Sequence, residues 1–115
     1  MMHELSLATA LVEQIREIMA REKAEKLLSV TVAMGALSGV EREAFGFCFP
    51  LVIEGSSLAG AELRIEEVPI RLHCLECGQE SQPAEVYLLS CSVCASSRVE
   101  ILAGRDFVIR SLEVQ

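Results

Sequence analysis

The chain has 115 residues, enough for one small domain but not for two full ones. Its 17 acidic and 10 basic side chains give a formal net charge of −7, which repels a phosphate backbone, so nucleic acid is excluded as a main partner. The longest uncharged apolar run, residues 45–53, is much shorter than the roughly 20 residues that cross a bilayer, so no membrane partner is expected. The chain shows no secretory signal pattern, and we expect a cytoplasmic, reducing location.

The first part of the sequence predicts a helix and two strands. Apolar residues recur at spacings of three and four over residues 5–19, which is typical of one stripe on an amphipathic helix. The apolar residues in that stripe are Leu5, Ala8, Val12, Ile15 and Met19. Apolar and polar residues then alternate over residues 28–35 and again over residues 62–70, and this period predicts two strands.

A second helix is predicted between these strands. Ser38 and Glu41 have the spacing of a capping box, so the helix should begin near residue 40. Pro50 is expected to kink the helix or to end it early, because proline lacks an amide hydrogen. The side chains expected to point inward are Ala44, Phe45, Cys48, Leu51 and Val52.

The end of the chain, residues 99–114, returns to strand character. Leu112 and Val114 continue its alternation on the opposite parity from Phe107 and Ile109. We therefore expect a bulge, or a change of the buried face, within the last strand. This strand should lie beside the first one in a mainly antiparallel sheet.

Four cysteines carry the strongest chemical signal. Cys74 and Cys77 form one C-x₂-C pair, Cys91 and Cys94 form another, and 13 residues separate the pairs. Two such knuckles bring four thiolates to one tetrahedral ion and leave no open position, which predicts a structural zinc site. A four-thiolate iron centre and disulfides are the alternatives. Cys48 stands alone in the second helix and is expected to be a buried apolar residue.

These elements define the expected fold class, which is α+β. A small sheet of about three strands should carry two helices on one face, and a zinc-ribbon subdomain should be added to it. We place the α/β domain at residues 1–70 plus 103–115 and the zinc ribbon at residues 71–102. The ribbon is too small to fold on an apolar core alone, so its metal has an evident structural task.

The start of the chain offers a second candidate metal site. A histidine third from a free amine, His3, can bring four nitrogens into one plane: the α-amine, two backbone amides and the imidazole. This donor set suits square-planar Ni(II) or Cu(II). A solvated terminus without any metal is the plain alternative. Glu4 is well placed for the dipole of the predicted helix under both interpretations.

Several segments together resemble one family, the HypA/HybF hydrogenase nickel-insertion metallochaperones. They are the opening Met2-His3-Glu4-Leu5-Ser6, the strand and turn of residues 32–37, the two C-x₂-C pairs and the closing strand of residues 109–114. The family chains begin Met-His-Glu, whereas this chain carries one additional methionine before that motif.

The resemblance implies a cytoplasmic nickel carrier that is not an enzyme. It implies that a partner nickel-binding GTPase helps to deliver Ni(II) to the large subunit of [NiFe] hydrogenase, and that some members also serve urease. By resemblance, nickel would be held by His3 with the backbone nitrogens around it at Met2, and with Glu4 as a neighbouring contributor. The zinc ligands would be Cys74, Cys77, Cys91 and Cys94. A zinc-ribbon adaptor without a nickel role is the alternative function.

Overall fold

The computed structural model describes residues 2–115, and Met1 and the side chain of Met2 lie outside the described part. Residue contacts divide the described chain into two compact units. The first unit comprises residues 2–32, 40–66 and 108–115, and the second comprises residues 33–39 and 67–107. In the described part of the chain, no helix is both long enough and apolar enough to cross a membrane.

Helix α1, Met2–Arg21, contains the predicted helix and extends it at both ends. Its buried side chains are Ala8, Leu11, Val12, Ile15 and Met19. This stripe confirms the predicted spacing except at Leu5, which is 40% exposed. The acidic Glu4 in the first turn and the basic Arg21 in the last turn both complement the helix dipole.

Helix α2, Arg42–Ile53, begins slightly later than predicted, and its cap is Glu41 rather than Ser38. The Glu41 carboxylate accepts the amide N–H of Glu43 at 3.2 Å and that of Ala44 at 2.7 Å. The predicted capping box is therefore wrong. A single carboxylate satisfies two first-turn amides, so the cap position belongs to Glu41.

The helix also continues past Pro50 to Ile53, so the expected early end is wrong. Pro50 removes one N–H bond of the helix, but its own carbonyl still accepts the N–H of Glu54 at 3.1 Å, so the last turn continues beyond it. The inward face differs from the prediction as well, because Leu51 is exposed while Phe49 and Ile53 are buried. The buried face of α2 consists of Phe45, Cys48, Phe49 and Ile53.

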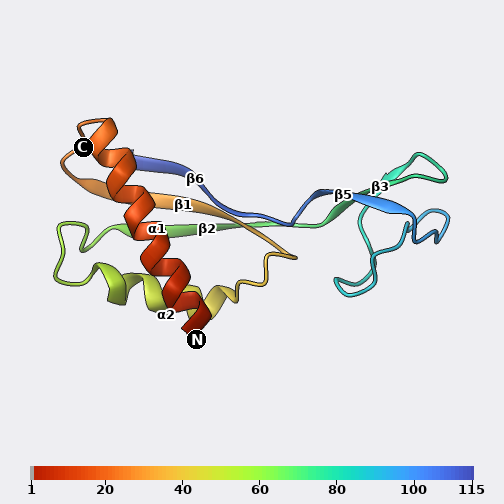
Figure 1. The fold of residues 1–115 in the computed structure, drawn as a ribbon, viewed down its shortest axis with the longest axis horizontal. Helices are drawn as coiled ribbons and strands as arrows, with labels where there is room; N and C mark the ends of the chain where they lie inside the picture. The colour runs from red at the N-terminus through yellow and green to blue at the C-terminus, as the bar shows by residue number, and fades with distance from the viewer. Residues whose placement is uncertain (1) are drawn as a thin grey trace. The chain divides into compact units, whose positions relative to one another are not determined.

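The sheet of the first unit has the strand order β2-β1-β6. Its strands are β1 (Leu27–Gly35), β2 (Glu62–Val68) and β6 (Phe107–Val114). Strands β1 and β2 run in the same direction and β6 runs in the opposite direction (Figure 1). The expected mainly antiparallel sheet is thus wrong for one of its two pairs, because α2 serves as a crossover that returns the chain to the same end. The three strands and two helices confirm the α+β class.

Strand β6 lies beside β1, as predicted. Lys26 and Gln115 exchange amide-to-carbonyl bonds of 3.1 and 2.9 Å at one end of this pair. At the other end Gly35 N–H donates to the carbonyl of Asp106 at 2.8 Å. The two ends show that the closing strand runs antiparallel to the first one and completes the sheet.

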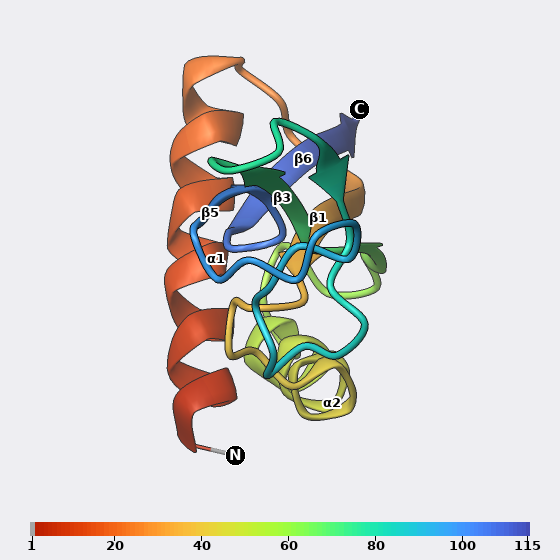
Figure 2. The same cartoon turned by 90° about the vertical axis from the view of Figure 1, so that its right-hand side faces the viewer.

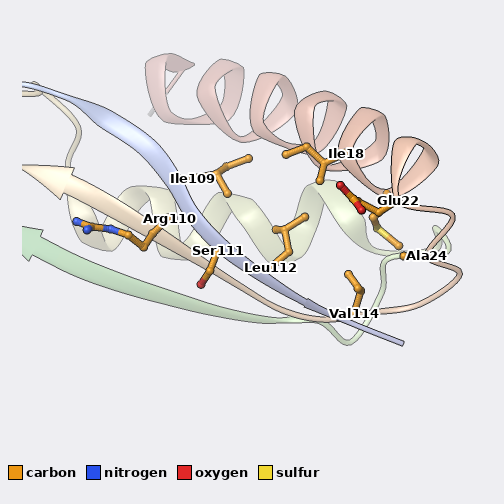
Figure 3. Close-up of a pocket in the computed structure, with 9 residues that line it drawn as sticks. Ile18, Glu22, Ala24, Ile109, Arg110, Ser111, Leu112 and Val114 are labelled. Atoms are coloured by element: carbon orange, nitrogen blue, oxygen red, sulfur yellow. The ribbon is translucent and has the colours of Figure 1, made fainter.

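The predicted change of face within β6 is also present. Ile109 and Leu112 are half-buried, whereas Arg110 and Ser111 between them are both exposed (Figure 3). Two successive outward residues are typical of a bulge, which shifts the parity of everything that follows.

The second unit contains a separate three-stranded sheet with the order β4-β3-β5. Its strands are β3 (Arg71–Cys74), β4 (Glu80–Ser81) and β5 (Val99–Ala103), and both pairs are antiparallel. The first cysteine of the metal motif, Cys74, is the last residue of the central strand. Leu72, on the same strand, is fully buried.

Two glycines allow the backbone of the second unit to make a very close crossing. A Cβ atom on Gly35 would lie 2.3 Å from the carbonyl oxygen of Gly104. Gly104 itself has a φ of +98°, and its own added Cβ would lie 2.8 Å from both Ile70 Cα and Pro69 O. The Gly104 carbonyl also accepts the N–H of Leu37 at 2.7 Å. No side chain fits at this crossing.

Replacing Gly35 with alanine should therefore reduce the free energy of unfolding by at least about 2 kcal/mol, because backbone atoms must move apart. The matched control is Gly46→Ala, whose added Cβ meets no atom within 4 Å and which should stabilise α2 by up to about 1 kcal/mol. Urea unfolding of the two variants measures both effects. Equal stabilities would show that the crossing does not constrain the fold.

Candidate metal centre

The two cysteine pairs adopt the same local conformation. In each, the second and third residues after the first cysteine donate their amide N–H groups to its sulfur, at 3.3 and 3.4 Å. The donors are Glu76 and Cys77 to Cys74, and Val93 and Cys94 to Cys91. These turns point both sulfurs of a pair to the same side, so each forms a knuckle of the predicted kind.

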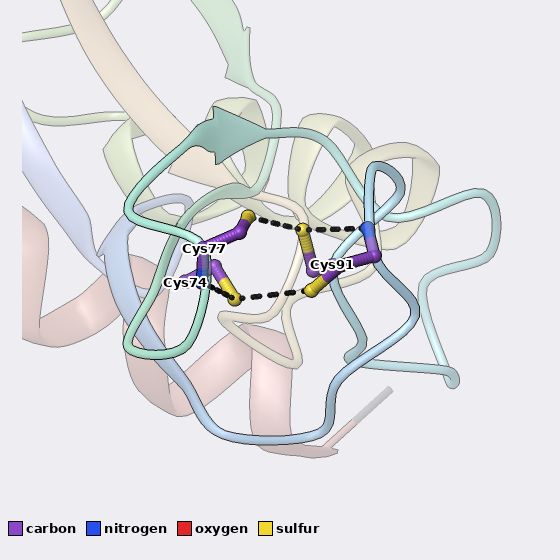
Figure 4. Close-up of side chains that lie close together, drawn as sticks. Cys74, Cys77 and Cys91 are labelled. Atoms are coloured by element: carbon purple, nitrogen blue, oxygen red, sulfur yellow. Dashed lines mark hydrogen bonds between the residues drawn. The ribbon is translucent and has the colours of Figure 1, made fainter.

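The four thiols converge on one point (Figure 4). All four Sγ atoms lie within 4.8 Å of one another. The shortest separations join the two knuckles, with 3.5 Å between Cys74 and Cys94 and 3.7 Å between Cys77 and Cys91. A tetrahedral zinc ion with Zn–S bonds of about 2.3 Å requires sulfurs about 3.8 Å apart. The cluster therefore fits a structural zinc ion.

Hydrogen bonding prepares half of the sulfurs to lose their protons. The hydrogen bond from Cys94 N–H lowers the pKa of the Cys91 thiol to about 6, and the one from Cys77 N–H likewise lowers the pKa of Cys74. The pKa of Cys94 is raised to about 12: the N–H of Ser96 lowers it, but the neighbouring thiols and desolvation outweigh this contribution. In each knuckle the first cysteine thus has a lowered pKa, which favours the thiolate, the form that binds metal.

The separations between the sulfur atoms also test the disulfide alternative. All five cysteines are free, and the closest sulfurs are much farther apart than the about 2.05 Å of a disulfide bond. Four thiolates complete a tetrahedral ion, so the site holds metal without offering a position to a substrate. Cys48 is buried on α2 as predicted and is not part of the cluster.

The residues predicted to bind nickel lie at the start of α1. His3 is an exposed residue of the first turn. Of Met2 the structure describes the backbone, which begins the helix, and Met1 with its α-amine lies outside the described residues. The N–H groups of a first helical turn have no carbonyl partner within the helix. Backbone nitrogen and imidazole are therefore both present at this end.

Glu4, which was predicted to contribute to the nickel site, does not have an exposed side chain. Its side chain is buried, and Oε2 accepts the N–H of Glu41 at 3.2 Å. This bond lowers the pKa of the Glu4 carboxyl. It joins the start of α1 to the start of α2, which lie at the same end of the first unit (Figures 1 and 2). Sequence reasoning missed this role of Glu41, because no local pattern links residues 37 positions apart.

His73 lies on the central strand β3, with Glu80 and Glu100 as its direct cross-strand neighbours. Its Nδ1 is 3.8 Å from Glu100 Oε2. His73 therefore lies beside a glutamate, although the next residue, Cys74, belongs to the four-cysteine cluster.

A closed four-thiolate site on a small ribbon, joined in one chain to an α/β unit with a histidine at its start, defines a small metal-binding protein. The family model described as "Hydrogenase/urease nickel incorporation, metallochaperone, hypA" matches residues 2–114. The chain belongs to this family of nickel-incorporation metallochaperones, which are maturation factors and not enzymes.

Individual relatives agree with this assignment. The hydrogenase maturation factor HypA of Synechococcus sp. is 41% identical over 113 residues, covering 98% of this chain and 99% of its own. The solution structure of the Ni metallochaperone HypA from Helicobacter pylori covers 96% of both chains, with a TM-score of 0.69 and 26% identity. A second solution structure, of a HypA protein, covers 100% of this chain and 98% of its own, with a TM-score of 0.73 and 28% identity.

Replacing Cys91 with serine should abolish stoichiometric zinc binding, because the ribbon loses the sulfur with the lowest pKa and the metal supplies its folding energy. Cys48→Ala is the matched control and should retain one zinc per chain. Metal analysis after dialysis measures both. A Cys91→Ser protein that still holds one zinc would contradict a four-cysteine site.

The fourth residue after the first cysteine has a left-handed backbone in both knuckles, as Gly78 with φ +78° and as Ala95 with φ +67°. Only the alanine is strained there. Gly78→Ala should thus weaken the first knuckle and Ala95→Gly should strengthen the second, each by about 1 kcal/mol. The rate of zinc transfer to a chelator measures both effects: it should rise in Gly78→Ala and fall in Ala95→Gly. A change in the same direction for both would exclude backbone strain as the cause.

Proposed function

We propose that this chain binds Ni(II) through His3 at its N-terminus and delivers it, with a partner nickel-binding GTPase, to the large subunit of [NiFe] hydrogenase. The setting for this delivery is the cytoplasm. The observation that carries the proposal is an exposed histidine in the first turn of a helix whose start is anchored by the bond between Glu4 and Glu41. Family membership supports the nickel cargo.

The donor atoms suit this cargo. The imidazole of His3 and the backbone nitrogens at Met2 and His3 are the kind of ligands that Ni(II) takes in a square plane. The amides of the first turn have no carbonyl partner within the helix, so removing their protons breaks no helical hydrogen bond. The buried carboxylate of Glu4 contributes by holding this first turn in place through its hydrogen bond with the Glu41 amide.

The two metals have different tasks in this proposal. The zinc-ribbon domain, residues 71–102, keeps its ion because four sulfurs enclose it. The nickel site has few protein ligands and lies at an exposed end, so its metal can be taken by a partner. A dissociation constant of about micromolar order, equivalent to roughly 8 kcal/mol, would permit both capture and release.

Replacing His3 with alanine should abolish stoichiometric nickel binding while zinc remains at one per chain, because only the nickel site loses a ligand. The matched control is His73→Ala, which removes the other histidine of the chain and should leave nickel affinity unchanged. Calorimetric titration of Ni(II) into zinc-loaded, untagged protein measures both.

Normal nickel binding by His3→Ala would refute the assignment of the site. A wild-type protein without any stoichiometric nickel site would instead favour a zinc-ribbon adaptor.

A further inference from the structure

The four cysteines of the metal centre differ in their access to solvent. Cys74 and Cys91, the first cysteine of each knuckle, are buried, with exposed fractions of 1% and 2%. Cys77 and Cys94, the second cysteine of each knuckle, are exposed. Both exposed cysteines line an open recess with a volume of about 600 Å³, which a small solute can enter. The other residues that line this recess are Glu76, Ala95, Ser96, Ser97 and Arg98.

The shortest sulfur separations each join an exposed cysteine to a buried one (Figure 4). Cys94 Sγ lies 3.5 Å from Cys74 Sγ, and Cys77 Sγ lies 3.7 Å from Cys91 Sγ. A disulfide bond of about 2.05 Å therefore requires each pair to approach by less than about 2 Å. The exposed sulfur of each pair is accessible to an oxidant, and the buried sulfur is in place to complete the bond.

We propose that the four-cysteine centre is a redox switch that responds to hydrogen peroxide. Cys77 and Cys94 are oxidised first, form disulfides with Cys91 and Cys74 across the two knuckles, and thereby release the zinc ion. The proposal concerns the zinc ribbon and does not rest on the proposed nickel site.

Each disulfide forms in two steps that balance. A metal-binding cysteine is a thiolate, the nucleophilic form. The exposed thiolate attacks one oxygen of hydrogen peroxide, so that a sulfur–oxygen bond forms, the oxygen–oxygen bond breaks, and the leaving hydroxide takes a proton to become water. The buried thiolate then attacks the sulfur of this sulfenic acid, the disulfide forms, and a second hydroxide leaves and becomes water. Two electrons pass from each pair of sulfurs to one peroxide, so two peroxides are consumed for each zinc released.

Pairing across the knuckles makes the change reversible. Both disulfides would join one knuckle to the other, so the two halves of the centre stay together after the ion has left. Disulfides within each knuckle would leave the halves unconnected, and strands as short as β3 and β4 supply too small a core to hold them. Reduction by a dithiol then returns four thiolates that already lie near one another and can bind zinc again.

Titration of the zinc-loaded wild-type protein with hydrogen peroxide tests the proposal. Zinc release, followed with a chromogenic chelator, should reach one ion per chain after two peroxides. Peptide mass mapping should find Cys74 linked to Cys94 and Cys77 linked to Cys91. Dimedone, which traps sulfenic acids, should at early times label Cys77 or Cys94 and neither buried cysteine. Dithiothreitol with added zinc should restore one ion per chain.

Matched variants test the access route and the role of the fifth cysteine. Ser97→Trp places a large side chain at the recess and should slow zinc release at least about threefold, because oxidation follows exposure of the sulfur. Ser92→Trp changes an exposed serine that does not line the recess and should release zinc at the wild-type rate. Cys48→Ala should also behave like wild type. Metal analysis confirms that each variant starts with one zinc.

Four outcomes would each overturn the proposal. They are zinc that stays bound in excess peroxide, disulfides formed within a knuckle, a sulfenic acid trapped first on Cys74 or Cys91, and equal rates of zinc release for the two tryptophan variants. None of these measurements uses nickel, so failure here is distinct from failure of the proposed function.

Discussion

The convergence of four thiolates is the constraint on which the second unit depends. Its sheet has one strand of only two residues and another of four, too little to form a core, and its buried side chains include two of the cysteines, Cys74 and Cys91. Amide groups of the knuckles donate to Cys74 and Cys91, so much of the local backbone is organised around sulfur. An ion that occupies all of its coordination positions with sulfur stabilises the architecture.

Under the proposed function the first unit meets the opposite requirement, because a metal that is to be delivered must be accessible. Its histidine is therefore at an exposed helix start and not in a cavity. An exposed start would fray without support, and the buried carboxylate of Glu4 supplies that support by accepting the Glu41 amide. Glu41 in turn caps α2 through its own side chain. The starts of the two helices are thus joined by a hydrogen bond one residue from His3 of the proposed nickel site.

Strand β6 shows how one irregularity keeps apolar side chains on the covered face of the sheet. The bulge at Arg110 and Ser111 keeps apolar residues against α1 on both sides of it, despite the change of parity in the sequence. A regular strand with these residues would present either Leu112 or Ile109 to solvent.

The sequence by itself determined the four-cysteine cluster, the first helix, the class of the fold and the irregular last strand, because each depends on local spacing or on thiolate chemistry. Only the tertiary structure decided the rest. The register of α2 follows from the cap at Glu41, so Phe49 and Ile53 are buried where Leu51 was expected. The tertiary structure also set the direction of β2. Two further contacts join residues far apart in the chain: the close approach of Gly35 to Gly104 and the bond between Glu4 and Glu41. No local period encodes such contacts, since they depend on which surfaces meet when the chain folds.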